Sequence, residues 1–160
     1  MADIANGPTP NGGTVDSLPP ETLQFAHRMF NAARSGDTVL LHAVDAGLPV
    51  NMTNDDGNTL LMLATYNGHA ELSEGLISRG ADVNRINDRG QSPLAGAVFK
   101  GYDKVVESLK NAGADPRLGT PTAIQTARMF NKAAILELLG ATDADMQESV
   151  PLPPGPPLQS

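Results

Sequence analysis

The residues of this 160-residue chain that could hold a metal or catalyse a reaction are few and scattered. Cysteine is absent, which excludes disulfides, thiolate catalysis and zinc–cysteine sites. The three histidines, His27, His42 and His69, lie far apart in the sequence and do not have the helical or turn spacing that metal ligands require. The sequence therefore predicts no metal and no cofactor.

One short stretch, Asn54-Asp55-Asp56-Gly57, faintly resembles a calcium loop. Such a loop needs a bidentate glutamate at its twelfth position, and that position is Leu63 here. The Asp55 and Asp56 carboxylates are expected on an exposed tip, where nothing desolvates either group for acid–base work. G-x-S-x-G, H-E-x-x-H and glycine-rich phosphate-loop motifs are also absent. We predict no catalysis, and a small enzyme is the disfavoured alternative.

The acidic stretch is better explained by the elements around it, in residues 54–84. Asp56-Gly57 is a turn signal, and Thr59 is placed to cap a helix whose apolar face includes Ala64. Gly68 closes that helix, and a second apolar series then runs to Gly80. The pattern predicts a turn, a helix, a turn and a second helix.

This unit repeats along the chain with a fixed period. Gly68 and Gly101 are 33 residues apart, and Gly80 and Gly113 are also 33 residues apart. Such self-similarity is typical of a stacked solenoid, because each unit leaves one apolar face for its neighbour to cover. In a shorter last unit, Ala127 aligns with Ala64 and Ala97, and Asn131 takes the place of the turn glycine.

The unit resembles the ankyrin repeat, whose pattern is D-x-x-G-x-T-P-L-H-x-A-A-x-x-G-H followed by G-A-D-V-N. The matching residues are Asn54, Gly57, Thr59, Leu61, Ala64, Gly68, His69, Gly80, Ala81, Asp82, Val83 and Asn84. Met62 and Ala95 replace the histidine that hydrogen-bonds between units in this family, so packing is expected to replace that contact. Thr59 and Ser92 keep the capping hydroxyl.

The predicted fold class is all-α, a solenoid of about four ankyrin-type helix–turn–helix units joined by short hairpins. The expected units are residues 22–51, 52–84, 85–116 and 117–141, of which the first is atypical. Residues 1–21 and 142–160 are rich in proline, and we expect a disordered leader and a disordered tail there. No apolar run is as long as that of a signal peptide or a membrane span, which predicts a cytoplasmic protein, with the nucleus as an additional location.

The resemblance implies a non-catalytic module that binds another protein on its concave side. The residues carried over to that side are Asp55, Asp56, Asn58, Tyr66, Asn67, Asp88, Arg89, Gln91, Phe99, Lys100, Met129 and Phe130. The net charge of −7 disfavours nucleic acid and is compatible with a partner that has a basic surface. We expect a monomer.

The sequence leaves two alternatives to this binding side open. The large side chains could merely cover the inner helices. The proline-rich tail, with several P-x-x-P spacings, could instead be the segment that a partner recognises, although it lacks a flanking Arg or Lys.

Overall fold

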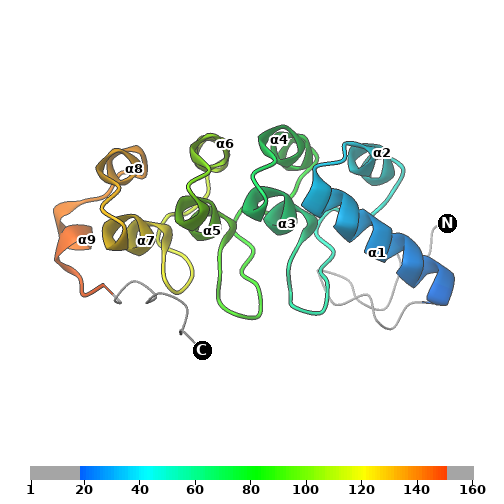
Figure 1. The fold of residues 1–160 in the computed structure, drawn as a ribbon, viewed down its shortest axis with the longest axis horizontal. Helices are drawn as coiled ribbons and strands as arrows, with labels where there is room; N and C mark the ends of the chain where they lie inside the picture. Colours follow the sequence, from blue (N-terminus) through cyan, green and yellow to red (C-terminus); the bar gives the residue numbers. More distant parts are fainter. Residues whose placement is uncertain (1–18, 151–160) are drawn as a thin grey trace, which may run out of the picture.

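The computed structural model describes residues 19–150, which fold into helices arranged in pairs along one axis (Figure 1). We call α1, α3, α5 and α7 the inner helices and α2, α4, α6 and α8 the outer helices, because each set forms its own row. The connecting hairpins extend beyond the inner row. The helices are α1 (Pro20–Ser35), α2 (Val39–Asp45), α3 (Leu60–Tyr66), α4 (Ala70–Ser78), α5 (Pro93–Lys100), α6 (Asp103–Asn111), α7 (Ala123–Met129), α8 (Ala133–Leu138) and α9 (Asp143–Gln147).

Three of the inner helices begin at a side-chain cap. The hydroxyls of Thr59, Ser92 and Thr122 each accept a hydrogen bond from the backbone N–H three residues later, at 3.0–3.1 Å. Each bond satisfies a donor that the first turn of a helix leaves without an intrahelical partner. The predicted caps at Thr59 and Ser92 are confirmed.

Every inner helix ends at a residue with positive φ. Gly36, Gly68 and Gly101 have φ near 80°, and Asn131 has φ of 55° in the corresponding place. Glycine has no Cβ to clash in this conformation, and asparagine is among the few other residues that tolerate it. The N–H of the next residue then donates to the carbonyl of Ala32, Ala64, Ala97 or Ala127, at 2.8–3.0 Å. The alignment of Asn131 with the turn glycines is therefore confirmed.

The residue that follows this turn contacts the previous unit. His69 lies against Gly36, where an added Cβ would fall 2.5 Å from the imidazole Nδ1. Its Nε2 is 2.8 Å from the Arg34 carbonyl oxygen, and since a carbonyl can only accept, Nε2 donates. Tyr102 covers Gly68 in the next unit in the same manner. His69 thus has a structural role between two units.

The core runs between the units as well as within them. Ala64, Ala97 and Ala127 are fully buried, on helices that pack as α3 against α5 and α5 against α7. Their small side chains let neighbouring inner helices approach closely. The proposed register, with these alanines in matching positions, is confirmed, and the stack follows the predicted all-α order.

Residues 142–150 differ from the expected disordered tail, because they carry α9 packed on α7. Thr142 and Asp145 form a capping box. The Asp145 carboxylate also accepts two hydrogen bonds from Arg117, at 3.0 and 2.7 Å. Arg128 Nη1 donates to the carbonyls of Asp145 and Glu148. Arginines distant in sequence thus hold a helix too short to be identified from its own pattern.

The other flank differs by two residues, since α1 already begins at Pro20, inside the expected leader. Proline suits the first turn of a helix, because its missing N–H has no intrahelical partner there. The remainder of the predicted leader, residues 1–18, and of the predicted tail, residues 151–160, lies outside the described residues.

Candidate functional site

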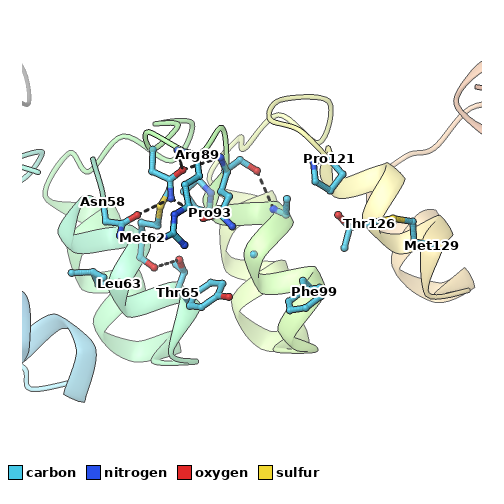
Figure 2. A pocket seen from close by; sticks show the side chains of 16 residues that line it. Asn58, Met62, Leu63, Thr65, Arg89, Pro93, Phe99, Pro121, Thr126 and Met129 are labelled. Carbon is cyan, nitrogen blue, oxygen red and sulfur yellow. Dashed lines mark hydrogen bonds between the residues drawn. The ribbon is translucent and has the colours of Figure 1, made fainter. Parts of the chain in front are cut away.

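An open groove of about 520 Å³ runs along the inner helices from α3 to α7 (Figure 2). We call it the concave groove. It is lined by Asn58, Met62, Leu63, Thr65, Tyr66, Asn87, Arg89, Gln91, Ser92, Pro93, Ala95, Gly96, Phe99, Pro121, Thr126 and Met129. Six of these were predicted from the sequence: Asn58, Tyr66, Arg89, Gln91, Phe99 and Met129.

Two exposed aromatic side chains line the concave groove, and each is held by a neighbour. The Tyr66 ring is 39% exposed and has the Lys100 ammonium 5.0 Å from its centroid. Phe99 is 46% exposed and meets Phe130 edge to face, with 5.6 Å between ring centroids. Such contacts limit ring motion, so little rotamer freedom remains to be lost on binding. Lys100 and Phe130, also predicted, support the aromatic residues without lining the groove themselves.

The floor of the groove on α5 is made by small residues. Gly96 is helical, and a Cβ added there would lie 3.0 Å from Tyr66 Cδ1, so the tyrosine ring rests directly on the backbone. Ala95 precedes it, at one of the two positions where the family pattern has histidine. Met62, at the other, is 5% exposed and contributes to the apolar lining. Packing therefore occupies the histidine positions, as expected.

Asn87 organises the polar rim of the groove, by which we mean Asn58, Asn87, Arg89 and Gln91. Its Oδ1 accepts from the backbone N–H groups of Arg89 and Gln91, at 2.9 and 3.0 Å. This fixes the amide, because only the oxygen can accept from a backbone N–H. The Asn87 Nδ2 must then donate, and it does so to Asn58 Oδ1 and Gln91 Oε1, each at 2.8 Å. The bond to Asn58 joins the rim of one hairpin to that of the next.

Four other predicted residues lie elsewhere. Asp55 and Asp56 border a second cavity, of about 370 Å³, between α1 and the first hairpin. Asp88 is exposed at a hairpin tip, where its N–H donates to the Asp56 carbonyl at 3.0 Å. Asn67 Nδ2 donates to the Leu63 carbonyl at 2.7 Å, a hydrogen bond to the last turn of α3.

Sequence reasoning missed the groove residues that are small, apolar or buried. Gly96 was detectable, since a glycine inside a helix costs about 1 kcal/mol relative to alanine and needs a packing reason. Thr126 and Pro121 come from the last unit, and only their position across from α5 brings them to the groove. Asn87 corresponds to Asn54 in the previous hairpin, and its residue type indicates only a turn.

The groove contains no acidic side chain, and Arg89 is its single charged residue. The carboxylates with lowered pKa values lie away from it. Hydrogen bonds from Arg117, and then from the Thr142 N–H, hold the pKa of Asp145 well below its usual range. Arg79 similarly lowers the pKa of Asp45. Within residues 19–150, no group of three or more His, Asp or Glu side chains is arranged to hold a metal ion.

None of the helices in residues 19–150 is both long and apolar enough to cross a membrane.

Helix pairs stacked through a repeated cap, a positive-φ turn and a buried alanine define a helical repeat protein with a groove on its inner face. The chain belongs to the ankyrin repeat family, since a family model described as ankyrin repeats (3 copies) matches residues 29–120. Ankyrin repeats generally mediate protein–protein interactions and are generally non-enzymatic.

A Pseudomonas aeruginosa protein named as an ankyrin repeat protein is 46% identical over 52 residues. This match covers 32% of the present chain and 30% of the relative.

Proposed function

We propose that this chain is a non-catalytic module that binds another protein in the concave groove, acting as a monomer. The observation that supports the proposal is the exposure of Tyr66, Phe99 and Phe130 at the ends of three successive inner helices. Exposed aromatic residues next to a preformed apolar groove have the composition of a binding hot spot. Aromatic truncation at such a site removes about 2 kcal/mol or more of binding free energy.

The test is affinity capture from cell extract with the full chain as bait. We expect the Tyr66→Ala/Phe99→Ala double variant to keep its far-ultraviolet circular dichroism and to lose the captured partner. Val39→Ala is the matched control, because Val39 is also 46% exposed but lies on outer helix α2. Capture that survives the double variant would exclude the concave groove.

Deletion of residues 151–160 distinguishes recognition of the proline-rich tail from binding in the concave groove. Deletion from residue 143 onwards would also remove α9, so loss of capture could then result from exposing α7. A deletion that begins after Val150 leaves α9 in place. If the tail is the recognised segment, this shorter deletion abolishes capture while the aromatic double variant keeps it.

A further inference from the structure

The charges of this acidic protein are divided between the two rows of helices. The inner helices carry four cationic side chains and one acidic side chain: Arg28, Arg34, Lys100, Arg128 and Glu21. The outer helices carry six acidic side chains and two lysines: Asp45, Glu71, Glu74, Asp103, Glu107, Glu137, Lys104 and Lys110. The net charge of −7, which was compatible with a basic partner, therefore does not describe the inner helices.

The cations nearest the groove have no carboxylate partner within the described chain. The ion pairs among residues 19–150 engage Arg79 and Arg117, neither of which lines the groove. Arg89 is exposed on the rim, and Lys100 lies over the Tyr66 ring. Because none of the residues that line the groove is acidic, an anionic group that binds Arg89 there meets no carboxylate of the lining.

The side-chain amides at the rim add hydrogen-bond donors, which, like the cations, favour an anionic ligand. With the oxygens of Asn58 and Gln91 directed to Asn87, their NH₂ groups are left without an acceptor among the described residues. Arg89 contributes further donors and no acceptor. A rim rich in free donors favours a ligand rich in acceptors, which carboxylates and backbone carbonyls both provide.

The floor of the groove on α5 favours an apolar group of the ligand beside its anionic group. On α5 the groove is lined by Phe99 and by Gly96, whose backbone the Tyr66 ring covers, so the surface between the two rings is apolar. These rings are already held by Lys100 and Phe130, and the groove volume is within the range of about 300–1,000 Å³ that is usual for ligand sites. A large aliphatic or aromatic side chain fits this chemistry.

We propose that the concave groove binds an extended acidic peptide segment of the partner, with a carboxylate at Arg89 and a large apolar side chain between Tyr66 and Phe99. This inference rests on the proposed function and names the chemistry of the partner. A nucleic acid is a poorer fit, because a continuous polyanion would meet the repulsion of the whole chain, whose net charge is −7.

The probe is a phage-displayed library of random linear peptides, selected on the full chain. We expect the enriched peptides to carry Asp or Glu within a few positions of a large apolar residue. Binding of the corresponding labelled synthetic peptides is then measured by fluorescence anisotropy. Enrichment of basic or uncharged peptides, absence of enrichment, or tighter binding of single-stranded oligodeoxythymidine would each overturn the inference.

Charge reversal locates the contact. Arg89→Glu is expected to weaken peptide binding by about tenfold or more, and to a smaller extent at high salt. Lys104→Glu is the matched control, because it makes the same change in net charge at an exposed position on outer helix α6. Equal affinities for the two variants would overturn the inference. If the Tyr66→Ala/Phe99→Ala variant lost capture while Arg89→Glu kept it, the proposed function would stand and only the acidic chemistry would fail.

Discussion

Replacing Asn87 by alanine should reveal how much stability its two donor hydrogen bonds contribute, one of which, to Asn58, links neighbouring hairpins. Asn87 is 8% exposed and makes four side-chain hydrogen bonds, two as acceptor within its own turn and two as donor to Asn58 and Gln91. Asn54 occupies the same place in the previous hairpin, and within residues 19–150 its side chain makes only the acceptor pair, from the N–H groups of Asp56 and Asn58, each at 3.0 Å. The two sites therefore differ in the donor bonds and in burial, since Asn54 is only half-buried.

A typical hydrogen bond contributes about 1 kcal/mol net to folding. Asn54→Ala should then lower the free energy of unfolding by about 2 kcal/mol, and Asn87→Ala by about 4 kcal/mol. Urea denaturation of the full chain, followed by circular dichroism, gives both values. The difference between the variants is the informative quantity, because turn propensity and loss of the acceptor pair are common to both. If the two variants lost equal stability, the two donor bonds of Asn87 would contribute nothing.

Three further predictions concern the stack. Gly36→Ala and Gly90→Ala both place a Cβ at positive φ, which costs about 1 kcal/mol each. Only at Gly36 would the added Cβ also collide with a side chain, that of His69, so Gly36→Ala should lower the urea midpoint further than Gly90→Ala. Ala64→Asp would bury an unpaired charge at a fully buried site and should cost several kcal/mol, and an unchanged melting temperature would contradict the register. Because the pKa of Asp145 is lowered in the folded state by Arg117, its contribution is complete above the unfolded pKa of about 3.9 and is lost as pH falls below it. The gap in urea midpoint between the wild type and Asp145→Asn should therefore be constant above about pH 5 and shrink towards pH 3, and a gap unchanged at pH 3 would contradict this assignment.

The fold was predictable because its determinants are local and recur. A capping hydroxyl at Thr59 or Ser92 and a positive-φ residue at Gly68 or Asn131 are each satisfied within a few residues of chain. The register of Ala64 against its counterparts follows from the period alone. The helix α9 was not predictable in this way, because its stability comes from arginines that precede it by many residues.

The site was predictable only in part, since a groove between units depends on pairs of side chains from different units. Tyr66 and Phe99 were identified as large residues near the turn. The way in which their rings are held was not predicted, because it depends on Gly96, which lies beneath the Tyr66 ring, and on Phe130, which meets the Phe99 ring edge to face. The additional hydrogen bonds that Asn87 donates also cannot be read from the sequence, in which Asn54 and Asn87 occupy equivalent positions.

The repeat separates the positions that make the same contact in every unit from the positions that do not. Positions that are the same in successive units, such as Ala64 and Ala97, face the neighbouring unit and must satisfy the same contact each time. The position just before this alanine instead holds Leu63, Gly96 and Thr126 in turn, and all three line the concave groove. The neighbours of this position differ from unit to unit, and at Gly96 the neighbour is the Tyr66 ring, so the size of the residue varies with what packs against it. The departure at Gly96, which carries a helix-propensity cost of about 1 kcal/mol, is therefore explained by the Tyr66 ring, which lies where a side chain at this position would begin.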